Sequence, residues 1–273
     1  MKYNVYHQIK IIALLLFSVV SCSKNNSFSP LPPQNFYTIT YQDSIVLKWE
    51  YPLCLFDSFI IYRSDKPLEE IIETTSTKII DSLNKYYLYA TTTSNKFVDK
   101  NVEIGKRYYY HVRTVYEGKY SKGTEELSDA PAIQGVLIIT SLENAIIINP
   151  YYHTLKVGDK NDSNAFLSFY ISNGNIYLKL LYYEDTNFYL HPGGICYMGN
   201  YEFYSPEVSW APDPDEVEYQ NAVNLYDVGS VYAVRLVLWG FNEVYIKFSL
   251  VSTGYNVWTF KYSYQPIIGY RNF

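Results

Sequence analysis

The chain has 273 residues, a formal net charge of −5 and an aromatic content of 18%, with tyrosine at 32 positions. The aromatic content excludes a disordered chain, because disordered sequences are poor in aromatic residues and carry a high net charge. The excess of acidic over basic residues argues against a nucleic-acid partner, since affinity for phosphates comes from Lys and Arg.

The amino terminus has the pattern of an export signal. Lys2 and Lys10 precede a largely apolar run, Ile11–Val20. A membrane-spanning helix needs about 20 apolar residues, so this run is too short to be one. We therefore expect residues 1–21 to be a secretory signal peptide.

The end of that signal carries a short motif. Val19-Val20-Ser21-Cys22 resembles the lipobox of bacterial lipoproteins. A lipobox consists of an apolar residue, a position that accepts many residue types, a small residue and an obligatory cysteine. The resemblance implies that Cys22 is acylated and becomes the first residue of the mature chain, anchored to a membrane by its lipids. Ser23 follows, where Asp would favour the inner membrane, so we expect an outer-membrane lipoprotein. Whether it faces the surface or the periplasm is left open.

The residues after Cys22 fit a tether. Residues 22–32 are polar and rich in proline, as linkers are. Removing residues 1–21 takes away two lysines and no acid, so the net charge of −5 becomes −7. This charge argues against docking on anionic headgroups, so the lipid would supply the membrane contact.

Period-two patterns follow from residue 33 to 132. Ile45, Leu47 and Trp49 alternate with more polar residues, and so do Tyr108 and Tyr110. Half-buried strands have this period, and short strands at such spacing predict an antiparallel sandwich of about 100 residues.

This region resembles the fibronectin type III fold. Pro33 followed by Ser44–Pro52 is similar to its first two strands, and Phe59–Ser64 and Gly105–Val115 are similar to its third and penultimate strands. The resemblance implies that Trp49 is the core tryptophan and that Tyr108 is at the tyrosine corner. Lys66–Asn95 is longer than the corresponding part of that fold and has weak periodicity, which indicates either an insertion or a short helix near Leu68–Glu73. We expect this domain to be a spacer, with a loop-based binding site as the alternative.

Residues 133–273 predict a second all-β domain. Asn173-Gly174 separates two apolar runs and is a strong hairpin signal. Glu243–Val251 alternates cleanly, and so do the residues from Trp258 to Tyr264. The fold class is thus all-β, a fibronectin type III-like sandwich followed by a second antiparallel β domain, either a sandwich or a flattened barrel.

The end of this domain supports an alternative function. Val228–Leu236, Val244–Phe248 and Thr259–Gln265 are similar to the closing hairpins of HmuY-like lipoproteins, some of which capture haem. Haem would need axial ligands, and the candidates of the domain are His153, His191 and Met198. None of them maps onto a ligand position of that family, and His191–Gly194 is first a turn signal.

The remaining motifs favour neither a metal nor an enzyme. Cys54 and Cys196 fall in different predicted domains, so we expect two separate buried thiols, with a disulfide as the alternative. Asp213–Glu218 is acidic but lacks glycine, which favours a solvated loop over a Ca²⁺ site. No nucleophile elbow, P-loop or paired-carboxylate pattern is recognisable. The sequence predicts a non-catalytic protein without a cofactor.

The leading hypothesis is a binding or adhesion lipoprotein that recognises a glycan or a protein through the second domain. Tyr and Trp suit such a surface, because they offer large, rigid and half-polar contact area. The candidates are the aromatic residues of this domain that fall outside the predicted strands: Tyr151, Tyr152, Tyr197, Tyr201, Tyr204, Trp210 and Tyr219.

Overall fold

A computed structural model describes residues 29–52, 55–67, 88–149, 154–162, 164–181, 191–238 and 242–273. Several predicted features lie outside the described residues, namely Cys22, Cys54, Tyr151, Tyr152, His153 and the segment Leu68–Glu73. Within the described ranges, no helix has the length and apolar character that crossing a membrane requires.

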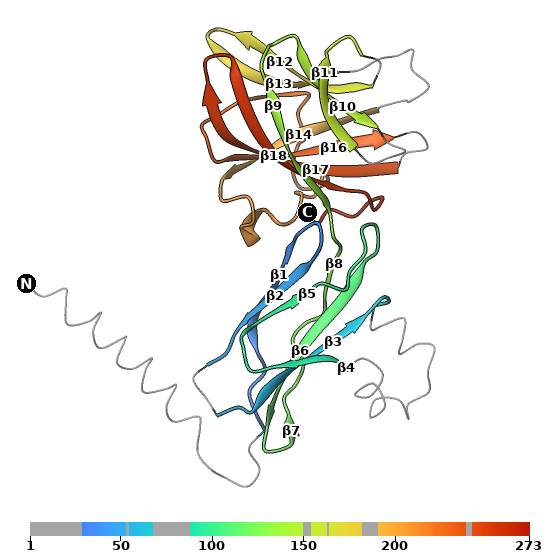
Figure 1. The fold of residues 1–273 in the computed structure, drawn as a ribbon, viewed down its shortest axis with the longest axis vertical. Helices are drawn as coiled ribbons and strands as arrows, with labels where there is room; N and C mark the ends of the chain where they lie inside the picture. Colours follow the sequence, from blue (N-terminus) through green and yellow to red (C-terminus); the bar gives the residue numbers. More distant parts are fainter. Residues whose placement is uncertain are drawn as a thin grey trace, which may run out of the picture. The chain divides into compact units, whose positions relative to one another are not determined.

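The all-β prediction is confirmed (Figure 1). Apart from a turn of 3-10 helix at Pro206–Val208, the regular elements of the described residues are strands. Their bounds are β1 Gln34–Thr40, β2 Ile45–Glu50, β3 Ser58–Ser64, β4 Leu88–Thr92, β5 Lys96–Asp99, β6 Tyr108–Tyr116, β7 Lys119–Tyr120, β8 Leu127–Asp129, β9 Ile133–Ile139, β10 Asn144–Asn149, β11 Thr154–Asp159, β12 Ala165–Ser172, β13 Asn175–Leu180, β14 His191–Asn200, β15 Ala222–Asn224, β16 Ser230–Leu238, β17 Asn242–Gly254 and β18 Val257–Gln265.

Contacts divide the chain into two compact units. The first comprises Met1–Thr38, Leu47–Val98 and Tyr108–Ser128, and the second comprises Ile39–Val46, Asp99–Arg107 and Asp129–Phe273. The predicted domain boundary between residues 132 and 133 stays a prediction.

The first unit is built on two sheets, one of β1, β2 and β5 and the other of β4, β3, β6 and β7, with β8 paired to β6. The ring of Trp49 on β2 contacts that of Phe59 on β3 at 5.3 Å between centroids, so side chains of the two sheets meet in a core. Trp49 and Tyr108 are only 2% and 3% exposed, which confirms both as core residues. Large aromatic side chains contribute much of the burial in such small sandwiches.

The second unit contains two five-stranded sheets, in the orders β11-β10-β12-β13-β15 and β14-β16-β17-β18-β9. One hydrophobic core takes side chains from both sheets, including Ile146 and Phe169 from the first and Val234, Ile246 and Phe260 from the second. This arrangement is a sandwich, one of the two alternatives that the sequence left open.

The hairpin predicted at Asn173-Gly174 is confirmed. β12 and β13 pair antiparallel with Ser172 opposite Asn175, so the two residues between them form the turn. Their φ angles of 50° and 78° are left-handed, which Asn and Gly tolerate better than other residues do.

The outer face of the β14-β16-β17-β18-β9 sheet is covered, which the alternation of β17 does not reveal. Val244, Ile246 and Phe248 face the core as predicted, but Tyr245 and Lys247 are also buried. Tyr245 belongs to a second cluster, called the outer cluster below, together with Cys196, Ala211, Ala233 and Phe273, and Met198 and Tyr219 pack against it. The Nζ of Lys247 lies 5.5 Å from the centroid of the Phe273 ring of this cluster.

Two loop predictions near residue 195 are wrong. His191–Gly194 is not a turn but the start of β14, with a bulge between His191 and Gly194. Tyr197 also belongs to β14, where it pairs with Tyr232 of β16. The glycines that suggested a turn serve a close approach instead, since a Cβ on Gly193 would lie 1.7 Å from the carbonyl oxygen of Arg235.

Candidate functional site

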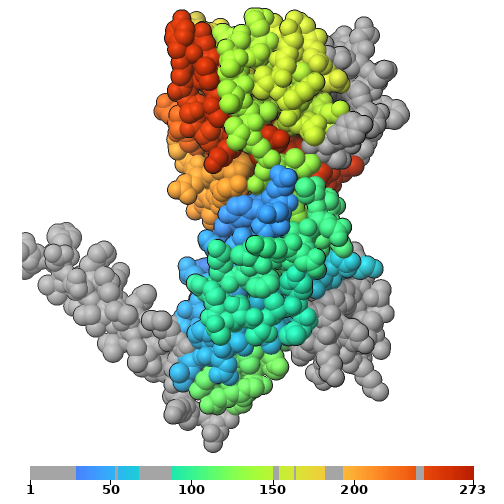
Figure 2. Space-filling view, viewed as in Figure 1, coloured from blue at the N-terminus to red at the C-terminus, as the bar shows by residue number. Residues whose placement is uncertain are grey.

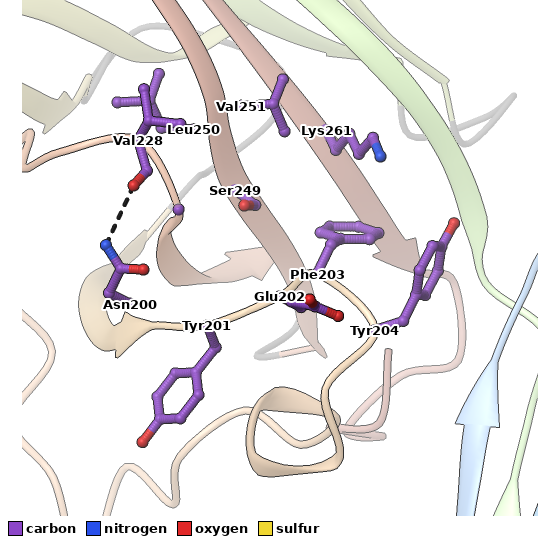
Figure 3. Close-up of a pocket in the computed structure, with 11 residues that line it drawn as sticks. Asn200, Tyr201, Glu202, Phe203, Tyr204, Val228, Ser249, Leu250, Val251 and Lys261 are labelled. Carbon is purple, nitrogen blue, oxygen red and sulfur yellow. Dashed lines mark hydrogen bonds between the residues drawn. The ribbon is translucent and has the colours of Figure 1, made fainter.

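The second unit has an open hollow of about 420 Å³ at the end of β14 (Figure 3). It is lined by Asn200, Tyr201, Glu202, Phe203, Tyr204, Val228, Gly229, Ser249, Leu250, Val251 and Lys261. On the face shown in Figure 2, the β17–β18 hairpin (red), β9 (green) and the segment near residue 200 (orange) lie side by side. The volume is within the range of small-ligand sites, about 300–1,000 Å³.

Backbone hydrogen bonds join the walls of the hollow to β17. Tyr201 N donates to Gly229 O at 3.1 Å, and Gly229 N donates to Leu250 O at 2.8 Å. The side chain of Asn200 donates to Val228 O at 3.1 Å. Gly229 has a φ of 93°, and a Cβ there would lie 2.5 Å from the Asn200 amide oxygen. Gly229 is therefore fixed to β17, and Asn200 and Tyr201 are fixed to the adjoining residues 228 and 229, which makes the hollow a built feature.

Tyr201 forms the rim of the hollow. It is 39% exposed, and its ring extends away from that of Tyr204 (Figure 3). The ring lies over Gly199, where an added Cβ would be 2.5 Å from it. Because residue 199 is glycine, the ring of Tyr201 can cover it with one face, and the residue is partly exposed to solvent.

Tyr204 is held more firmly. Its ring centroid is 4.5 Å from that of Tyr41 and 5.0 Å from that of Phe203, and its hydroxyl donates to the Gln134 side-chain oxygen at 3.1 Å. Burial, together with the neighbouring Tyr41, raises the pKa of Tyr204. Its hydroxyl therefore stays protonated at neutral pH and can keep donating to Gln134.

The polar residues of the hollow are few and of both signs. Glu202 and Lys261 are exposed, whereas Ser249 on β17 is buried. Lys261 on β18 is opposite Val136 of β9 in the register. The hollow thus combines aromatic rings and apolar surface with single hydrogen-bonding groups, which suits a neutral ligand that has both C–H surface and hydroxyl groups.

Three further aromatic residues predicted for the site, Tyr197, Trp210 and Tyr219, have different neighbours. Tyr197 packs on Tyr226 at 4.5 Å, and Trp210 packs on Tyr270 at 5.5 Å. The hydroxyl of Tyr219 donates to Pro212 O at 3.0 Å, and its ring packs against the outer cluster. Of the predicted aromatic residues, the structure brings Tyr201 and Tyr204 to the hollow.

Sequence reasoning missed Glu202, Val228 and Lys261. Lys261 reads as an ordinary solvent-facing residue of an alternating strand. Val228 is 48% exposed, but nothing in the sequence places it beside residue 200. A contact between segments so far apart in the chain depends on the strand order, which local patterns do not determine.

Two of the three haem-ligand candidates, His191 and Met198, belong to the described residues, and neither is among the residues that line the hollow. His191 is at the start of β14, and Met198 packs against the outer cluster. In the described part of the chain, no three or more His, Cys, Asp or Glu residues are grouped to hold a metal ion.

Cys196 is a buried free thiol. Its sulfur lies 3.7 Å from Tyr197 O, and burial raises its pKa. It is therefore not an activated thiolate.

Comparisons with known proteins identify no family. No family model matches the chain, and no curated protein matches it. Similar solved structures include "Structure of FN3tt mut", at 16% identity and a TM-score of 0.28, which covers 38% of this chain and 97% of that chain. A human fibronectin type III domain has 14% identity and a TM-score of 0.29, covering 41% of this chain and 92% of that chain. The chicken interferon gamma receptor alpha chain has 10% identity and a TM-score of 0.26, covering 87% of this chain and 92% of that chain.

Proposed function

We propose that the protein is a membrane-anchored, non-catalytic binding protein that recognises a glycan through the hollow at residues 200–204, with a protein ligand as the alternative. The observation that carries this proposal is the combination of the Tyr201 and Tyr204 rings with Glu202, Ser249 and Lys261 in one hollow.

The chemistry of the hollow favours a sugar over a charged ligand. A sugar presents C–H groups on its faces and hydroxyls on its edges, and tyrosine offers an apolar ring with a polar tip. Glu202 and Lys261 supply one acceptor and one donor of opposite charge, so the hollow has no excess of either sign. A polyanionic ligand would also be repelled by the net charge of −7 expected for the chain without residues 1–21.

A glycan array tests the proposal most broadly. The full chain, purified in detergent, is expected to bind a reproducible set of glycans and to be retained on that set after detergent exchange. If no glycan is bound reproducibly while a protein is recovered repeatedly from solubilised outer membrane, the glycan part of the proposal is wrong.

The lipid anchor has its own test. Because Ser21-Cys22 follows the apolar run directly, we expect Cys22→Ala to abolish incorporation of a fatty-acid probe into the chain. Cys196→Ala is the matched control and should be labelled like the wild type. Labelling that persists in Cys22→Ala would overturn the anchor and, with it, the outer-membrane location.

The haem alternative is tested by adding haem to the purified chain. Our proposal expects no Soret band above that of free haem. A band that disappears in His153→Ala or His191→Ala would replace the glycan proposal by haem capture.

A further inference from the structure

Lys247 is a buried ionisable residue that contacts Phe203, one of the residues that line the hollow. It lies in the middle of β17 and is 2% exposed. Its Nζ donates to the carbonyl oxygen of Phe203 at 2.9 Å and to that of Val208 at 3.3 Å. The rings of Phe203 and Phe273 lie 4.6 and 5.5 Å from the same nitrogen and shield it from water.

These two contacts join the ends of one short segment, Phe203–Val208. The segment includes two residues of the hollow, Phe203 and Tyr204, and lies outside the sheet strands. Its internal backbone bonds are local, such as Val208 N to Ser205 O at 3.2 Å. The side chain of Lys247 therefore connects the wall of the hollow to the sheet beneath it.

We infer that Lys247 is a positioning residue of the hollow, which holds Phe203–Val208 closed as a neutral amine and lets the segment open when it takes up a proton. This inference rests on the proposed function, because opening of the segment affects binding only if the hollow is the binding site. A neutral amine has two N–H donors, and these match the two carbonyl acceptors that the structure gives them.

The surroundings of Lys247 support the neutral form. Burial lowers its pKa to about 7, although the carboxylate of Asp129 acts in the opposite direction. Its register partners Ala233 and Ser263 do not ionise. Tyr204, Tyr219, Tyr245 and Cys196, in the outer cluster and the segment, have raised pKa values and stay neutral near pH 7. The remaining ionisable group of the segment, Glu207, is an exposed carboxylate whose pKa is lowered by the hydrogen bond from Ser205, and water screens its charge.

The direction of the pH effect follows from linkage. An opened segment exposes Lys247, whose pKa then returns to about 10.4, the value of an exposed lysine. Between pH 7 and 10 the open form thus binds more protons than the closed form, so raising the pH favours closure. Protection against opening should increase by up to tenfold per pH unit in this range and be flat below pH 7.

Amide hydrogen exchange of the full chain, read by mass spectrometry from pH 6 to 9 and corrected for the intrinsic rate, tests the inference. We expect the protection of peptides that span Phe203–Val208 to rise at least tenfold from pH 7 to pH 9. Lys261→Met, which removes an exposed lysine of the same hollow, should keep this rise, whereas Lys247→Met should remove it.

Two results would overturn the inference. One is a flat protection profile in the wild type, which is decisive even if Lys247→Met fails to fold. The other is a profile that keeps its slope in Lys247→Met. No ligand is present in the exchange experiment, so its outcome is independent of glycan binding. Protection that rises with pH in a protein that binds no glycan counts against the proposed function alone. Glycan binding together with a flat protection profile counts against the role of Lys247 alone.

Discussion

Gly193 illustrates how closely single residues are packed in the second unit. A Cβ on this residue would lie 1.7 Å from the carbonyl oxygen of Arg235, whereas a Cβ on Gly254 would meet only Val257, at 3.9 Å. We therefore expect Gly193→Ala to lower the free energy of unfolding by more than about 2 kcal/mol, because the backbone must shift, and Gly254→Ala to change it by less than about 0.5 kcal/mol. Urea titrations compare the two variants, and equal midpoints would show that β14 does not approach β16 so closely.

His111 makes the stability of the first unit depend on pH. Its ring stacks on that of Tyr62 at 4.5 Å, and burial, together with the nearby Arg113, lowers its pKa to about 4. In an unfolded chain the pKa of a histidine is about 6.5, so unfolding takes up a proton between these values. Stability is thus fully present above pH 6.5 and falls as the pH drops toward 4.

His111→Gln should remove this part of the pH dependence. We expect the melting temperature of the wild type to decrease from pH 6.5 to 4 more steeply than that of the variant. Parallel curves for the two proteins would mean that His111 is solvated and titrates normally.

At the scale of elements, the β12–β13 hairpin depends on its turn. Gly174 has a φ of 78°, and a Cβ there would meet nothing within 4 Å, so a substitution costs backbone strain alone. Gly174→Ala should destabilise the protein by about 1 kcal/mol, while Asn173→Gly, which keeps a left-handed residue in place, should change stability by a few tenths. Differential scanning calorimetry measures both variants, and an unchanged Gly174→Ala protein would argue against this turn geometry.

Strands whose two faces differ could be predicted from the sequence, and strands covered on both faces could not. On β6, Tyr108, Tyr110 and Val112 face the core as their alternation predicts. On β17 the alternating residues Tyr245 and Lys247 are also buried, because a segment far along the chain covers them. Local periodicity reports the polarity of a strand but not what covers its polar face.

The candidate site could be predicted only in part from the sequence. Tyr201 and Tyr204 stand out as aromatic residues next to a strand, and both line the hollow. Tyr219 has the same sequence signature but packs against the outer cluster. The difference comes from tertiary packing, which no property of the tyrosines themselves reveals.

In the proposed function, the whole molecule combines a lipid anchor at its start with a recognition unit. The sequence before residue 33 predicts a signal, a lipidated Cys22 and a tether, and the described residues form β-sheets. We propose that the anchor determines the location of the protein and that the hollow of the second unit determines which ligand it binds. The acidic net charge of −5 fits a protein whose membrane contact is made by lipid rather than by basic residues.

Calorimetric titration of the full chain with a glycan selected on the array measures whether the hollow binds that glycan. Tyr201→Ala and Lys261→Ala, which alter the hollow, should each weaken binding about tenfold or more. Tyr255→Ala, at a tyrosine that is 95% exposed in the β17–β18 hairpin, and Lys156→Ala, at an exposed lysine of β11, should bind like the wild type. Wild-type affinity in both hollow variants, or an equal loss in the two controls, would contradict the account.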